Sequence, residues 1–183
     1  ADVQSCLRFL ILGEKGTFSG NHLDILAGTW ILGLSGLKLW WAFTGDFTEK
    51  NKEEFICEGA SWNPDSMQLL PIEPGDYLMM MPGHLCAHAP FSMEDCLMTG
   101  GMFWNDNMLP QLLDNITWIC EHNAVVSNEG VPRQLVTVLE VLSRRPDLSE
   151  DVREAMLRTE VRLRPLLSCS CKDSGGCKDE CAC

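Results

Sequence analysis

Short apolar runs dominate the chain between Cys6 and about Trp104, and they constrain the fold more than any other feature. The clearest four runs are Leu7–Leu12, Thr29–Leu32, Leu37–Trp41 and Tyr77–Met81. Glycine and proline residues separate these runs, as is typical of strands joined by turns. The pattern predicts an all-β sandwich or barrel in the first part of the chain.

After Asn105 the apolar residues recur at three- and four-residue steps instead, which is typical of helices. The first helix is predicted from Leu109 to Cys120, the second from Pro132, and the third after an N-cap at Ser149. The polar segment 48–65 is expected to be an insertion loop. The sequence therefore predicts three parts: a β core over residues 1–105, a helical extension over 106–168 and a cysteine-rich tail over 169–183.

Charge and hydropathy exclude several function classes. The net charge is −12, and all of it lies in the first 131 residues. Direct nucleic-acid binding by the β core is not expected, because it needs a basic surface. The longest apolar stretch, Ile25–Phe43, contains three glycines and Lys38, so two strands around a Ser35-Gly36 turn are predicted rather than a membrane span. No secretory signal is recognised, and the chain starts without Met, as a fragment or a processed protein would.

Cysteine usage differs between the two ends of the chain. Five cysteines are scattered singly, and we expect them to be small core residues. Five more crowd into the tail: Cys169, Cys171, Cys177, Cys181 and Cys183. Two Cys-x-Cys pairs in a short polar segment indicate metal ligands in a reducing compartment, and zinc is the predicted ion. The tail loosely resembles the first half of a CXC zinc cluster, although its spacing is irregular.

The pair His22 and Asp24 is the sharpest chemical motif. Residues two apart on a strand point to the same face, so an imidazole and a carboxylate are predicted to lie together. They supply two members of the 2-His-1-carboxylate set that binds Fe(II) in non-haem oxygenases. Lys38 opens an apolar strand, where a lysine needs a partner or an anionic ligand. His84 and His88 follow the Pro74-Gly75-Asp76 turn and the Tyr77–Met81 run.

The order of these motifs, together with Asp95 and Gly100-Gly101, resembles the JmjC family of cupin-like 2-oxoglutarate oxygenases over roughly Cys6 to Trp104. The resemblance implies a double-stranded β-helix, the jelly-roll or cupin-like fold. It implies that His22, Asp24 and His88 bind Fe(II), with His84 as a rival to His88. It also implies that Lys38 holds the far carboxylate of 2-oxoglutarate, with Ser19 or Thr17 as a hydroxyl donor.

The resemblance further implies an Fe(II)- and 2-oxoglutarate-dependent oxygenase that acts on a protein, as a hydroxylase or a histone lysine demethylase. Tyr77 is the only tyrosine, and Phe9 stands where family members often have one. The residues therefore favour oxygenase chemistry in general over lysine demethylation. The acidic β core favours a basic protein or peptide, such as a histone tail, as substrate. The expected location is the nucleus or the cytoplasm. A catalytically inactive JmjC-like chromatin or interaction module, and a cupin-like enzyme that does not use 2-oxoglutarate, are the alternatives.

Overall fold

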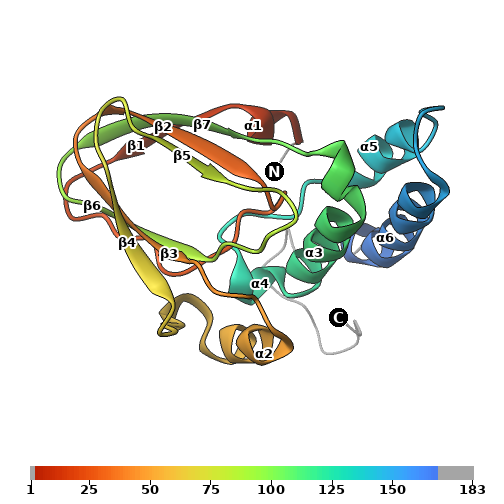
Figure 1. The fold of residues 1–183 in the computed structure, drawn as a ribbon, viewed down its shortest axis with the longest axis horizontal. Helices are drawn as coiled ribbons and strands as arrows, with labels where there is room; N and C mark the ends of the chain where they lie inside the picture. Colours follow the sequence, from red (N-terminus) through yellow and green to blue (C-terminus); the bar gives the residue numbers. More distant parts are fainter. Residues whose placement is uncertain (1–2, 169–183) are drawn as a thin grey trace.

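A computed structural model describes residues 3–168, which form two antiparallel β-sheets with helices gathered at one end (Figure 1). The four-stranded sheet has the order β1-β7-β2-β5, and the three-stranded sheet has the order β4-β3-β6. The strands are β1 (Phe9–Gly13), β2 (Thr29–Ser35), β3 (Lys38–Phe43), β4 (Met67–Ile72), β5 (Tyr77–Met80), β6 (His88–Ser92) and β7 (Cys96–Met102). Within residues 3–168, no helix is both long and apolar enough to cross a membrane.

The segment 17–22 acts as a further strand at the edge of the three-stranded sheet. Phe18 pairs with Phe91 and His22 with His88, both antiparallel to β6. The chain alternates between the two sheets twice. It visits the four-stranded sheet with β1 and β2 and the three-stranded sheet with segment 17–22 and β3. It then alternates again, with β4 and β6 in the three-stranded sheet and β5 and β7 in the four-stranded one. This alternation is the topology of a double-stranded β-helix. The predicted mainly β, cupin-like fold with a helical extension is confirmed.

The inner faces of the two sheets enclose a small apolar core. Alternate residues of the strands point inward, and five of them form this cluster: Ile31, Trp40, Ile72, Met80 and Met98. The alternation has a period of two because successive side chains of a strand leave opposite faces. The cluster is separate from the larger apolar core that includes residues of the helices.

The helices are α1 (Val3–Leu7), α2 (Glu49–Glu58), η1 (Gly59–Ser61), η2 (Asp106–Met108), α3 (Leu109–Glu121), α4 (Asn123–Val126), α5 (Leu135–Leu142) and α6 (Glu150–Ser168). The three predicted helices correspond to α3, α5 and α6, although α5 begins at Leu135 rather than at Pro132. The Ser149 hydroxyl accepts a hydrogen bond from the Val152 N–H, as an N-cap does.

The insertion loop predicted for residues 48–65 is wrong, because this segment contains α2. A capping box between Thr48 and Asn51 starts the helix: the side chain of each residue accepts the backbone N–H of the other. Phe55 is the only buried residue of this helix. The sequence of α2 therefore lacks the apolar residues at three- and four-residue steps that would have predicted a helix. Phe55 stacks on Trp62 with ring centroids 5.0 Å apart, and this contact fixes α2 to the rest of the protein.

The helical extension shares one continuous apolar core with the end of the β-helix. Leu23, Ile25 and Leu26 belong to the same buried cluster as residues of α3, α5 and α6. The Leu23 N–H also donates to the Val126 carbonyl of α4 at 2.8 Å. Packing of the extension therefore fixes the backbone that carries the His22-x-Asp24 motif.

Candidate metal centre

His22 and His88 face each other across two paired strands. Each backbone N–H donates to the carbonyl of the other residue, at 3.0 and 2.9 Å. Such a directly opposed pair projects its side chains from the same face of the sheet. The two imidazole rings accordingly lie with their centroids 4.3 Å apart.

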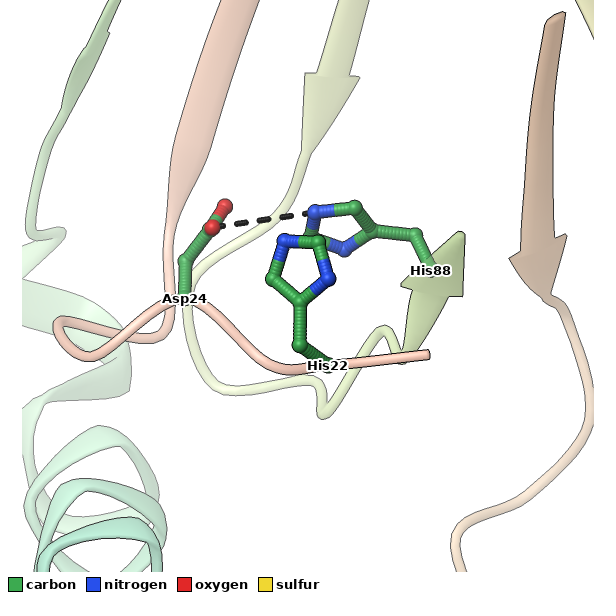
Figure 2. A group of neighbouring side chains, drawn as sticks. All are labelled: His22, Asp24 and His88. Atoms are coloured by element: carbon green, nitrogen blue, oxygen red, sulfur yellow. Dashed lines mark ion pairs between the residues drawn. The ribbon is translucent and has the colours of Figure 1, made fainter. Parts of the chain in front are cut away.

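Asp24 completes the group, because the extended backbone after His22 returns its side chain to the same face (Figure 2). Its Oδ1 lies 3.7 Å from His88 Nε2. One ligand atom from each of the three residues falls within 4.8 Å of the others. Both histidines are buried, and Asp24 is partly exposed. The structure thus brings together the three predicted iron ligands.

The protonation of both rings is set by backbone carbonyls. His22 Nδ1 donates to the Gly20 carbonyl at 2.8 Å, and His88 Nδ1 donates to the Cys86 carbonyl at 3.0 Å. When Nδ1 carries the proton, the neutral ring has its lone pair on Nε2. This is the usual arrangement of histidines that bind a metal through Nε2.

Burial favours the neutral form of His22, which is the form that binds a metal ion. Desolvation, reinforced by the neighbouring His88, lowers the pKa of His22 from 6.5 to about 4. The ring of His88 stacks on Trp40 at a centroid distance of 4.8 Å, which holds its orientation. Two imidazoles and one carboxylate on one face form the donor set preferred by non-haem Fe(II). The residues present fit such an ion.

A cavity of about 420 Å³ opens beside the three ligands, between the two sheets and the loop 128–130. Lys38 and Ser19 line it together with His22, Asp24 and His88. Lys38 is 6% exposed, and burial lowers the pKa of its amine. Among residues 3–168, no carboxylate lies within 4 Å of this amine. The nearby Cys96 thiol acts on the amine in the opposite sense to burial and raises its pKa. The cavity therefore combines a metal-binding group with a buried lysine that has no carboxylate partner among the described residues.

Two further polar groups of the cavity have no partner among the described residues. The Thr29 hydroxyl and the Trp40 indole N–H are buried without a hydrogen bond, and both residues line the cavity. An unsatisfied buried donor costs about 1–3 kcal/mol, so both groups are available to hydrogen-bond a water or a ligand in the cavity. The sequence analysis missed both residues, because neither belongs to a motif and both look like ordinary strand residues.

Glu129 is a third cavity residue that the sequence analysis missed. It lies in the loop between α4 and α5, and its Oε2 accepts the Ile25 N–H at 2.9 Å. Burial and the nearby Asp24 charge raise the pKa of Glu129 from 4.5 to about 7. The helical extension thereby holds the peptide directly after Asp24. No local signal in the sequence could have linked residues 104 positions apart.

We expect Glu129→Ala to weaken metal binding by about 10-fold, because the backbone beside Asp24 loses its anchor. Glu129→Gln keeps an oxygen acceptor for the Ile25 N–H and should bind the metal as the wild type does. Titration with Mn²⁺ measures the affinity. Glu154→Ala, on the surface of α6, is the matched control. Equal affinity in the Ala and Gln variants would contradict this positioning role.

The remaining predicted site residues lie elsewhere. The Thr17 hydroxyl donates to the Glu14 carbonyl at 2.6 Å, and Thr17 is exposed outside the cavity, so the structure favours Ser19 of the two candidates. His84 is exposed in the loop after β5 and is not part of the three-residue group. The tail cysteines Cys169, Cys171, Cys177, Cys181 and Cys183 lie outside the described residues, so their zinc site stays a prediction.

Comparison with known proteins gives one relative by sequence. The chain is 35% identical over 125 residues to KK-1 biosynthesis cluster protein D of Curvularia clavata. The match covers 68% of this chain but only 12% of the relative's length. No family model matches. Membership in the JmjC family therefore stays a prediction.

Solved structures with a similar chain course share little sequence with this chain. A cupin superfamily protein of Desulfitobacterium hafniense is 15% identical with a TM-score of 0.35, covering 53% of this chain and 66% of its own. Hydroquinone 1,2-dioxygenase of Sphingomonas sp. TTNP3 is 9% identical with a TM-score of 0.39, covering 54% and 59%. Because these identities and TM-scores are low, the fold is assigned from the strand order of this chain itself.

Proposed function

We propose that this protein is an Fe(II)- and 2-oxoglutarate-dependent oxygenase that hydroxylates a protein substrate. One observation carries the proposal: a 2-His-1-carboxylate group and a buried lysine with no carboxylate partner among residues 3–168 share a single cavity. The three ligands alone would suit several cupin-like enzymes. The lysine adds a site for a carboxylate, which 2-oxoglutarate supplies and a simple O₂-dependent reaction does not need.

His22, Asp24 and His88 would hold the iron, and all three side chains line the cavity. Bound Fe(II) supplies the O₂ chemistry in which 2-oxoglutarate, O₂ and a substrate C–H give succinate, CO₂ and a C–OH group. The protein's own part is orientation. Trp40 packs on His88, the two carbonyls hold the rings, and the enclosing sheets keep bulk water from the reacting atoms.

Lys38 would bind the far carboxylate of 2-oxoglutarate through a charge-assisted hydrogen bond. The hydroxyl groups of Ser19 and Thr29 and the indole N–H of Trp40 would donate hydrogen bonds to 2-oxoglutarate from the same cavity. This assignment gives the two unsatisfied buried donors a partner. It also gives the Lys38 amine a carboxylate partner, which the described residues do not supply.

A basic protein or peptide is the substrate class that the charge distribution favours. The net charge of −12 and the half-buried Glu129 at the cavity both attract cationic side chains. Hydroxylation is favoured over lysine demethylation, because the only tyrosine, Tyr77, lies outside the cavity and stacks on Trp30. The name of the Curvularia clavata relative, a biosynthesis cluster protein, supports an enzyme rather than an inactive chromatin or interaction module.

The test is incubation of the iron-loaded protein with a Lys/Arg-rich histone-tail peptide, 2-oxoglutarate and O₂. We expect succinate and a peptide heavier by one oxygen atom. The apparent affinity for the peptide should fall between low and physiological salt, because the Debye length shortens to about 8 Å. Formaldehyde release would indicate demethylation instead. Succinate formation with an oligonucleotide but not with the peptide would contradict the substrate class, and no succinate under any condition would contradict the oxygenase.

A further inference from the structure

The outer face of the four-stranded sheet is almost entirely apolar. Cross-strand pairing places Leu10, Thr99, Leu32 and Tyr77 in one row across all four strands. A second row contains Trp30 and Met79, and a third contains Leu12 and Leu97. Directly paired residues share a face of a sheet, so these side chains all point outward. We call these residues the apolar sheet face: Leu10, Leu12, Trp30, Leu32, Tyr77, Met79, Leu97 and Thr99.

Little of the described chain covers this face. Leu10 is 70% exposed and Leu12 is 80% exposed. Helix α1 reaches only one end of the sheet, where the Leu7 carbonyl lies against Gly101. The other helices lie beyond the end of the β-helix or beside the three-stranded sheet (Figure 1). An antiparallel sheet usually exposes polar side chains on its uncovered face, whereas contiguous apolar patches mark interaction sites.

Charge is absent from the apolar sheet face, although the chain as a whole is strongly acidic. The eight residues carry no ionisable group except the Tyr77 phenol, and the Thr99 hydroxyl is used internally by donating to the Phe9 carbonyl. Acidic residues gather instead in the turns at one end of the sheet, where they include Glu14, Glu73, Asp76, Glu94 and Asp95. The exposed Arg8 lies at the opposite end, just before β1.

We propose that the apolar sheet face binds a second copy of this chain face to face, about a two-fold axis that lies in the interface plane and is perpendicular to the strands. Two copies with a net charge of −12 each repel one another least where they meet at an uncharged surface, and this face is such a surface. The two-fold axis turns one copy end for end. It separates the two sets of acidic turns and brings the Arg8 end of each copy toward the acidic end of the other. The face is therefore self-complementary, as an isologous interface requires.

The size of the face sets the expected strength of the dimer. Four strands span about 14 Å between the outer two, and five residues of strand extend about 17 Å. This footprint is smaller than the ~800 Å² per partner of a standard stable interface. We expect a concentration-dependent dimer with a dissociation constant in the micromolar range rather than a permanent one.

Sedimentation velocity of the full chain, from about 5 to about 200 µM, tests the proposal over the range where such a dimer would form. The wild type is expected to shift from monomer to dimer. Leu12→Lys and Met79→Lys lie at opposite edges of the face and place a charge within it. Each should keep the protein monomeric throughout. Val161→Lys is the matched control, because Val161 is also an exposed apolar residue (69%) but lies on α6, and it should dimerise as the wild type does.

Circular dichroism confirms that each variant is folded, which is expected because the replaced side chains are at least 45% exposed. A wild-type protein that stays monomeric up to the highest concentration would overturn the proposal. So would dimerisation that survives both substitutions in the face, or dimerisation that Val161→Lys abolishes. None of these measurements depends on the oxygenase activity.

Discussion

His88→Ala is expected to abolish metal binding and 2-oxoglutarate-dependent succinate formation. The substitution removes one of three ligands and leaves only His22 and Asp24 at the site. Loss of a residue that merely supports a ligand costs about 10–100-fold in affinity, and loss of a ligand itself should exceed this. Titration with Mn²⁺ and a succinate assay measure the two effects. His88→Gln should also lose metal binding and succinate formation. It retains more of the buried volume next to Trp40 than His88→Ala does, so it should disturb the packing less.

His84→Ala is the control for this prediction. His84 is exposed, lies four positions before His88, and is absent from the three-residue group. Its removal should leave metal affinity and succinate formation close to the wild-type values. If instead His84→Ala lost the metal and His88→Ala kept it, the ligand assignment would be wrong.

Much of the β-helix could be predicted because its signals are local. A strand of four to seven residues with a buried inner face needs alternating apolar residues and a turn at each end, and the sequence shows both. The His22-x-Asp24 spacing is likewise local, since extended backbone returns every second side chain to the same face. The choice of His88 over His84 rested on the family's spacing to Asp95 and Gly100-Gly101, whereas the register that pairs His88 with His22 is visible only in the hydrogen bonds of the structure.

The features that could not be predicted depend on contacts between distant segments. Helix α2 has one buried residue, and its stability rests on Phe55 packing against Trp62 rather than on an apolar stripe. Glu129 reaches the cavity only because the extension shares its core with residues beside Asp24. Ser19 and its alternative Thr17 are both hydroxyl residues shortly before His22, and both pair with β6. Only the tertiary structure distinguishes them: Ser19 lines the cavity, whereas the Thr17 hydroxyl donates to the Glu14 carbonyl.

Lys38→Met is expected to remove 2-oxoglutarate binding while leaving the metal site intact. The ammonium is the only group of the proposed co-substrate site that carries a positive charge. Truncating one partner of a buried charge pair costs about 2–5 kcal/mol, which corresponds to roughly 30- to 5000-fold weaker binding. The measurement is 2-oxoglutarate affinity in the Mn²⁺-loaded protein. Lys50→Met, at an exposed lysine that pairs with Glu54 on α2, should bind 2-oxoglutarate normally.

Thermal unfolding distinguishes this role of Lys38 from a structural one. In the protein without co-substrate the amine is buried, and no carboxylate of residues 3–168 lies within 4 Å of it. Burial lowers its pKa by more than the nearby Cys96 thiol raises it, so the charged form opposes folding. A methionine of similar length avoids this cost, and Lys38→Met should therefore melt at the same temperature as the wild type or higher. Added 2-oxoglutarate should raise the melting temperature of the wild type but not that of the variant. A variant that is less stable and still binds 2-oxoglutarate would show that Lys38 supports the fold rather than the co-substrate.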